Sequence, residues 1–97
     1  AERLMRSRYS AFALGLDEYL LRSWHSSTRP SDCGFDETLE WRRLLIESVE
    51  GGGPFEDSGS VTFTAIARGA EGRFEQRERS EFVREGGHWF YVDGESL

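Results

Sequence analysis

Lysine is missing from this sequence, and cysteine and methionine occur once each. All twelve basic residues are arginines, which excludes a Schiff-base lysine and the lysine of a phosphate-binding loop. Cys33 alone can form neither an internal disulfide nor a structural zinc site. No apolar run approaches the roughly 20 residues that span a bilayer, and no signal-peptide pattern opens the chain. We therefore expect a cytoplasmic protein that binds no metal, no cofactor and no membrane.

The 97 residues suffice for one domain, residues 1–97, with one small core. Its 37% of hydrophobic and 13% of aromatic residues indicate a globular chain rather than a disordered one. Acidic residues outnumber basic ones by 18 to 12, which gives a net charge of −6. Such a charge repels nucleic-acid phosphates. The expected partner is therefore an unknown small molecule or protein, and not a nucleic acid.

Two helices are predicted in the first quarter of the chain. Residues 2–14 carry an apolar stripe at helical spacing, and Gly15 is a suitable C-terminal stop. A second, shorter helix is expected from Asp17 to Trp24. The stripe of the first helix consists of Met5, Tyr9, Phe12 and Leu16.

The second half of the chain predicts strands. Residues 61–68, 73–85 and 88–93 alternate or are rich in strand-forming residues, and turns at 69–72 and Gly86-Gly87 separate them. Counting back from both turns places one apolar set on a single face, and a slip by one residue would scatter it. This set is Val61, Phe63, Ala65, Ala67, Phe74, Phe82, Trp89 and Tyr91.

The middle of the chain is less regular. Residues 25–38 and 51–60 are rich in turn-forming residues and are expected to be loops. Residues 39–50 fit a helix or a strand, and periodicity does not decide between them. Two helices followed by an antiparallel meander predict an α+β fold in which the helices cover the aromatic face of the sheet.

Several polar residues interrupt the expected core. Arg8 points into the apolar stripe of the first helix, and a buried charge must be paired or line a wet cavity. We predict that Arg8 pairs with Glu78 or Asp93, either as a structural salt bridge or as the polar anchor of a ligand pocket. The loop after the second helix adds Trp24, His25 and Arg29 as candidates. The candidate pocket residues are Arg8, Tyr9, Phe63, Gln76, Glu78, Ser80, Trp89, Tyr91 and Asp93.

Five segments resemble a known family: LMRSRYSAF (4–12), DEYLLRSWH (17–25), LEW (39–41), ERS (78–80) and FVREGGHWFYVDG (82–94). Together they resemble the YchJ family of uncharacterised bacterial proteins. The resemblance implies a nuclear transport factor 2-like middle domain, a cone in which helices close over a curved antiparallel sheet. It also implies a strand at 39–50. Family members often carry SEC-C metal-binding motifs, which are absent here, so no zinc role carries over.

No G-x-S-x-G, H-E-x-x-H or C-x-x-C motif is present, and no catalytic residue is assigned. The leading hypothesis is a non-catalytic binding or accessory domain with a small pocket between helices and sheet. The alternative is a small cone-fold enzyme of the isomerase or dehydratase type with Glu78 or Asp93 as base. An inward carboxylate without a partner favours the enzyme, and one locked to Arg8 favours the binding domain.

The outer face of the predicted sheet bears on assembly. The resemblance implies a dimer that forms through this face. Its apolar patch is surrounded by charges and is too small to supply the roughly 800 Å² per partner of a stable interface. We therefore expect the isolated domain to be a monomer rather than a dimer. The patch consists of Ile66, Val83, Phe90 and Val92.

Overall fold

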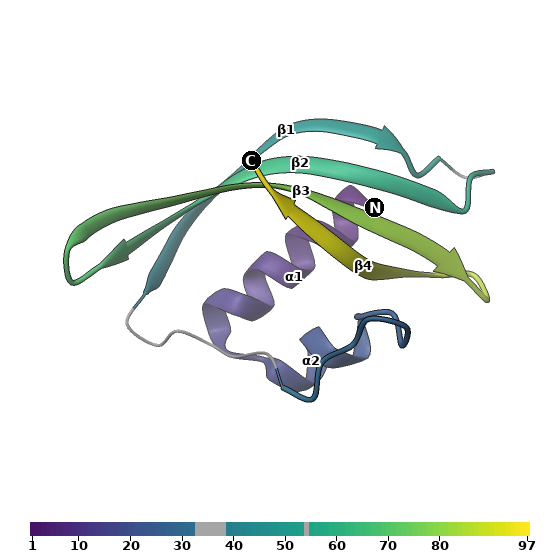
Figure 1. Ribbon diagram of the computed structural model, residues 1–97, viewed down its shortest axis with the longest axis horizontal. Helices are drawn as coiled ribbons and strands as arrows, with labels where there is room; N and C mark the ends of the chain where they lie inside the picture. Colours follow the sequence, from purple (N-terminus) through teal and green to yellow (C-terminus); the bar gives the residue numbers. More distant parts are fainter. Residues whose placement is uncertain (33–38, 54) are drawn as a thin grey trace.

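The computed structural model describes residues 1–32, 39–53 and 55–97. Helices α1 (Glu2–Leu14) and α2 (Asp17–Arg22) precede a single antiparallel sheet whose strand order follows the sequence. The long strands curve around α1, which crosses the concave face of the sheet (Figure 1). This arrangement confirms the predicted α+β fold. The strands are β1 (Glu40–Gly51), β2 (Ser58–Gly69), β3 (Gly72–Glu85) and β4 (His88–Ser96).

Helix α1 ends where the sequence predicts. Gly15 adopts a left-handed conformation with φ of 70°, which glycine reaches without steric cost. The N–H of Leu16 donates to the carbonyl of Ala11 at 2.9 Å, and this closes the helix. Among the described residues, no helix is long and apolar enough to cross a membrane.

Helix α2 ends two residues earlier than predicted. The carbonyl of Ser23 accepts a hydrogen bond from the N–H of Tyr91 at 2.9 Å, and the N–H of His25 donates to the carbonyl of Tyr91 at 2.7 Å. Trp24 thereby pairs in parallel with Tyr91 at the edge of β4. The backbone leaves the helix because it gains hydrogen bonds to the sheet, a contact that local sequence does not encode.

Most of the predicted register is confirmed. The aligned residues bury one face of the sheet beneath α1, and Val61, Phe63, Ala65 and Phe82 are each at most 5% exposed. Phe74 lies on this face too, but it is 43% exposed because it lies close to the turn that joins β2 to β3, at the end of the sheet. The confirmed pairs are Ala67–Phe74, Ala65–Gln76, Phe63–Glu78, Val61–Ser80, Phe82–Tyr91 and Arg84–Trp89.

One predicted pair is wrong. Ser80 lies opposite Gly94 rather than Asp93, because a bulge at Val92 inserts one residue into β4. Asp93 instead faces Glu81 and is exposed. The bulge therefore moves Asp93 to the outer face and removes it from the candidate pocket.

Strands extend further into the middle of the chain than its composition indicates. Residues 40–51 form a strand, as the family resemblance implies, with Trp41, Leu44 and Ile46 packed against the core. Strand β2 begins at Ser58, so the connection is shorter than the predicted loop at 51–60. Periodicity alone did not decide between a helix and a strand here, because two register shifts against β2 interrupt the alternation of β1.

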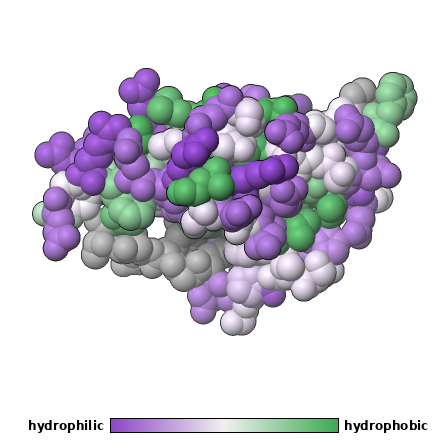
Figure 2. Space-filling view, turned by 45° about the horizontal axis from the view of Figure 1, so that its top comes forward, coloured by the Kyte–Doolittle hydropathy of each residue, from purple (hydrophilic) through white to green (hydrophobic). Residues whose placement is uncertain are grey.

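The outer face of the sheet is largely polar. Arg77 on β3 bonds Glu47 on β1 at 2.9 Å across the face, and Thr64 on β2 donates to the same carboxylate at 2.8 Å. Both hydrogen bonds lower the pKa of Glu47, and the bond from Arg77 has the larger effect. Val83 lies opposite Phe90 as predicted, and the His25 ring meets Phe90 edge-on at 6.1 Å. Figure 2, which looks obliquely onto this side, shows hydrophobic patches separated by hydrophilic side chains.

Candidate functional site

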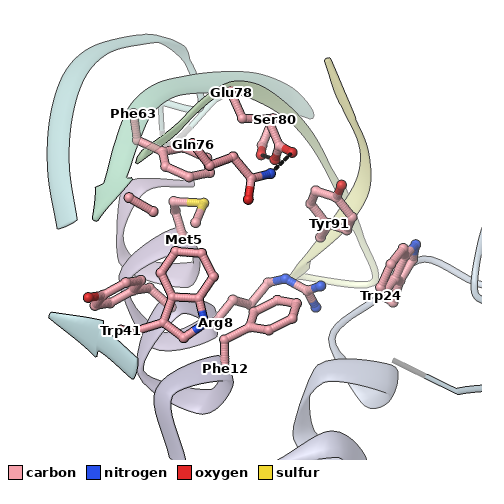
Figure 3. Close-up of a pocket in the computed structure, with 12 residues that line it drawn as sticks. Met5, Arg8, Phe12, Trp24, Trp41, Phe63, Gln76, Glu78, Ser80 and Tyr91 are labelled. Atoms are coloured by element: carbon pink, nitrogen blue, oxygen red, sulfur yellow. Dashed lines mark hydrogen bonds between the residues drawn. The ribbon is translucent and has the colours of Figure 1, made fainter. Parts of the chain in front are cut away.

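A cavity of about 140 Å³ lies between α1 and the inner face of the sheet. Its walls are mainly apolar and aromatic side chains from α1, β1 and β2, and polar groups from β3 gather at one end (Figure 3). The apolar wall is formed by Met5, Tyr9, Phe12, Trp24, Trp41, Phe63 and Ala65. The polar lining is formed by Arg8, Gln76, Glu78, Ser80 and Tyr91.

Regular secondary structure explains why these residues meet. On α1, spacings of three and four residues place Met5, Arg8 and Phe12 on one face of the helix. On β3, every second side chain points to the concave side, so the polar lining residues Gln76 and Ser80 flank the carboxylate between them. All the lining residues except Trp24 therefore lie on α1 or on a strand of the sheet.

Glu78 is held by its two neighbours on the same face of β3. The amide nitrogen Nε2 of Gln76 donates to Oε1 of Glu78 at 3.3 Å. The hydroxyl of Ser80 donates to Oε2 at 2.7 Å. Figure 3 shows these bonds at the sheet side of the cavity, opposite the aromatic rings of α1 and β1. Both carboxylate oxygens thus already accept a hydrogen bond within the protein.

Gly94 makes room for this carboxylate. A Cβ atom at Gly94 would lie 2.6 Å from Cδ of Glu78 and 2.8 Å from the hydroxyl oxygen of Tyr91. Only a residue without a side chain lets these two groups occupy the space above β4 together. An isolated glycine in a strand often marks a bulge or a place where another group approaches the backbone closely. Gly94 is therefore the sequence signal for the bulge in β4 and for the close approach of Glu78, and the alternation of side chains does not reveal either.

Arg8 is buried, 3% exposed, but it does not pair with the predicted carboxylates. Its Nη1 donates to the carbonyl of Leu20 at 2.8 Å and to the hydroxyl of Ser23 at 2.6 Å. The guanidinium carbon lies 4.4 Å from the ring centroid of Tyr91 and 5.1 Å from that of Trp24. Arg8 therefore joins α1 to the end of α2 and to the cavity wall.

The predicted ion pair is wrong for both acids. Asp93 lies on the outer face, and within the described ranges Glu78 binds Gln76 and Ser80 instead of Arg8. Arginine reaches several partners through its long side chain. The helical angle of Arg8 therefore predicts that it points inward but not which group it meets.

Burial and charge make Tyr91 hard to ionise. Desolvation, followed by the negative charge of Glu78, raises the pKa of Tyr91 to about 12, and nearby Arg8 lowers it by a smaller amount. Burial also raises the pKa of Tyr9, whose hydroxyl has no hydrogen-bond partner among the described residues. Both phenols, which are neutral at physiological pH as any tyrosine is, therefore stay neutral to a more alkaline pH than an exposed tyrosine.

Alkaline pH should therefore destabilise the fold through Tyr91. Below pH 10 the phenol is neutral in the folded and the unfolded chain. Between pH 10 and pH 12 the unfolded chain loses this proton while the folded one keeps it, so the free energy of unfolding should fall as pH rises. Urea unfolding at stepwise pH measures this slope. Tyr91→Phe should flatten it and the control Tyr19→Phe should not; equal slopes in both variants would contradict the assignment.

The structure brings together most of the predicted site residues. Two of the predicted pocket residues lie elsewhere: Trp89 packs beside Arg84, 5.7 Å from ring centroid to guanidinium, and Asp93 is on the outer face. Four lining residues were not among the predicted ones: Met5, Phe12, Trp41 and Ala65. The eight that the structure places in the lining are Arg8, Tyr9, Trp24, Phe63, Gln76, Glu78, Ser80 and Tyr91.

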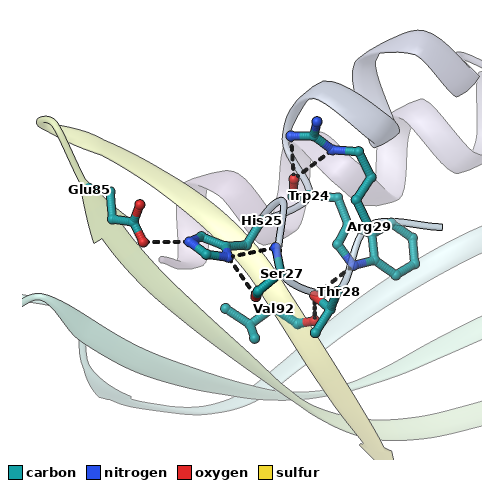
Figure 4. A network of polar contacts seen from close by, with 7 residues as sticks. All are labelled: Trp24, His25, Ser27, Thr28, Arg29, Glu85 and Val92. Carbon is teal, nitrogen blue, oxygen red and sulfur yellow. Dashed lines mark hydrogen bonds and ion pairs between the residues drawn. The ribbon is translucent and has the colours of Figure 1, made fainter.

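His25 and Arg29 lie outside the cavity and secure the segment that carries Trp24 (Figure 4). His25 contacts Glu85 through Nε2 and Ser27 through Nδ1, the latter at 2.7 Å. Arg29 donates twice to the carbonyl of Trp24, at 3.1 and 2.8 Å. These residues hold a wall of the cavity rather than lining it. Among the described residues, no three His, Cys, Asp or Glu side chains gather to hold a metal ion.

Helices closing over a curved sheet around an inner cavity define the cone of nuclear transport factor 2-like domains. A family model described as "YchJ, middle NTF2-like domain" matches residues 1–94. The chain belongs to this family, which confirms the resemblance of its sequence.

Bacterial relatives cover almost the whole chain. A UPF0225 protein of Streptomyces avermitilis is 47% identical over 95 residues, which are 98% of this chain and 65% of the relative. A UPF0225 protein of Corynebacterium efficiens is 48% identical over 96 residues, 98% of this chain and 72% of the relative. The chain thus spans about two thirds of the length of these curated relatives.

Two solved structures share the fold. A SEC-C motif containing protein from Rhodopseudomonas palustris, solved in solution, matches with a TM-score of 0.82 at 28% identity, over 97% of this chain and 76% of that chain. The crystal structure of another SEC-C motif containing protein, from Psychrobacter arcticus, matches with a TM-score of 0.75 at 24% identity, over 95% and 58%.

Proposed function

We propose that this domain binds a small, largely apolar ligand in the cavity between α1 and the sheet and does not convert it. The composition of the cavity carries the proposal, because aromatic walls with a few convergent polar groups are the usual make-up of a ligand site. Its volume of about 140 Å³ is close to that of an apolar cavity that holds benzene in another protein. The ligand, or the part of it that enters, is therefore about the size of one ring.

The polar end specifies what this ring should carry. Glu78 offers carboxylate oxygens, and the side-chain oxygen of Gln76 points into the cavity in Figure 3. These groups are hydrogen-bond acceptors. A hydroxyl on the ligand ring would donate to them while the ring lies among Met5, Trp41 and Phe63. A phenol-like group therefore satisfies the apolar and the polar lining together.

Phenol and toluene, which have nearly the same shape, test this proposal. We expect phenol, titrated while amide resonances are followed by NMR, to perturb residues around Phe63 and Glu78. Ala65→Leu adds a side chain to the cavity wall and should abolish this binding, whereas Ala13→Leu, an exposed change on α1, should leave it intact. Phenol binding that survives Ala65→Leu would place the ligand elsewhere and refute the proposal.

Glu78→Leu separates the polar contact from simple burial. A hydrogen bond to a charged group is worth about 1.5–3 kcal/mol. The variant should therefore bind phenol roughly ten- to a hundredfold more weakly and toluene no more weakly than the parent. Equal losses for both probes would show that the substitution damages the cavity instead of removing an acceptor.

An enzyme is the second candidate, because Glu78 and the Tyr91 hydroxyl lie together above Gly94. A carboxylate base beside a neutral phenol donor could move a proton next to a carbonyl group. The bonds from Gln76 and Ser80 favour an anchor over a base. Deuterium exchange into cyclopentanone, accelerated by the parent and lost in Glu78→Gln, would overturn this preference.

A further inference from the structure

A second hollow lies on the opposite side of the sheet from the cavity, near the turn between β2 and β3. It measures about 540 Å³ and combines four arginines from three strands. Arg42 and Arg43 come from β1, Arg68 from β2 and Arg73 from β3, and Ile66 contributes an apolar side chain between them. One third of the arginines of an acidic chain thus gather at one place.

The arrangement works against the stability of the sheet. Arg68 and Arg73 are direct partners across β2 and β3, and like charges in such positions repel each other. On the other side, Arg68 faces Glu40, but the carboxylate of Glu40 contacts Arg42 at 3.3 Å. Arg73 contacts Glu75 at 2.6 Å. Within the ranges that the structure describes, Arg43 and Arg68 form no ion pair.

We propose that this arginine hollow, defined by Arg42, Arg43, Arg68 and Arg73, binds the phosphate groups of a small molecule. Guanidinium groups present paired N–H donors that match phosphate oxygens. A bound phosphate would relieve the repulsion between Arg68 and Arg73. The ion pairs of Arg42 and Arg73 are more than half exposed on the arginine side and can rearrange at little cost.

The rest of the molecule limits the size of the anion. With a net charge of −6, the surface beyond the hollow repels an extended polyanion. Glu75 and Glu81 on β3 lie on the same outer face, so the surface charge changes there from positive at the arginines to negative. A compact phosphorylated molecule meets only the arginines, and its organic part can lie against Ile66. These observations favour a small ligand over a nucleic acid.

Calorimetry at low ionic strength with pyrophosphate and adenosine diphosphate tests the proposal. Both probes should bind the parent, and the double variant Arg43→Gln/Arg68→Gln should bind at least about tenfold more weakly. The control Arg3→Gln/Arg22→Gln removes the same charge from exposed positions on the helices and should stay near the parent. Circular dichroism confirms that each variant is folded.

The two probes identify the source of the phosphate. Tighter binding of adenosine diphosphate supports an organic ligand that uses Ile66, and equal binding supports a free oxyanion of the same chemistry. Failure of both probes to bind the parent, or an equal loss in the control variant, overturns the proposal. So does tighter binding of a single-stranded oligonucleotide, which would replace the small ligand with a nucleic acid.

Discussion

Replacing Phe82 with alanine should lower the free energy of unfolding by about 3–5 kcal/mol. Phe82 is 1% exposed and lies in the core with Met5, Val61 and Phe63. Its ring meets Tyr91 edge-on, with the centroids 5.8 Å apart, so the substitution removes an aromatic contact as well as buried area. A domain of this size is stable by only about 5–15 kcal/mol, and the loss is a large part of that.

Phe55→Ala is the matched control, because Phe55 is 95% exposed and lies in the connection before β2. It removes the same atoms from water rather than from the core and should change the stability by less than about 0.5 kcal/mol. Urea unfolding followed by fluorescence compares the two variants with the parent. Similar midpoints for Phe82→Ala and Phe55→Ala would show that the aromatic face is not the core.

The register was predictable because short turns fix it and both hairpins give the same answer. Gly86 and Gly87 both have positive φ, as the turn of the second hairpin requires, so counting back from this turn aligns Phe82 with Tyr91. The alternation of β2 then identifies the buried face. These features depend on neighbouring residues and on a period of two, which the sequence displays directly.

The departures have non-local causes. The bulge at Val92 moves Asp93 to the outer face. A strict alternation of side chains along β4, which takes no account of a bulge, places Asp93 on the inner face instead. Helix α2 stops early because Trp24 joins β4, and the sequence between them gives no sign of that contact. The partners of Arg8 were not predictable either, since Leu20 lies in α2 and Ser23 caps its C-terminal end, and only the packing of the two helices brings them to Arg8. Packing between distant segments decided each of these points.

Arg8→Met should cost about 2–4 kcal/mol of stability. The variant removes the charged donor from the Leu20 carbonyl and the Ser23 hydroxyl, and it removes the cation from the rings of Trp24 and Tyr91. Arg8→Lys should recover only part of the loss, because an ammonium lacks the flat fork that bonds and stacks at the same time. Arg3→Met, on the exposed face of α1, is the control and should be nearly neutral.

Double-mutant cycles then distinguish the observed contacts of Arg8 from the ion pair that its position in the sequence predicts. The cycle of Arg8→Met with Tyr91→Leu should give a coupling energy of about 1–2 kcal/mol, because the guanidinium lies over that ring in the buried cavity wall. The cycle with Glu78→Gln should give a smaller one, since Glu78 is held by Gln76 and Ser80. If Glu78 couples to Arg8 more strongly than Tyr91 does, the two charges interact directly and Arg8 anchors the helix through the sheet instead of through α2.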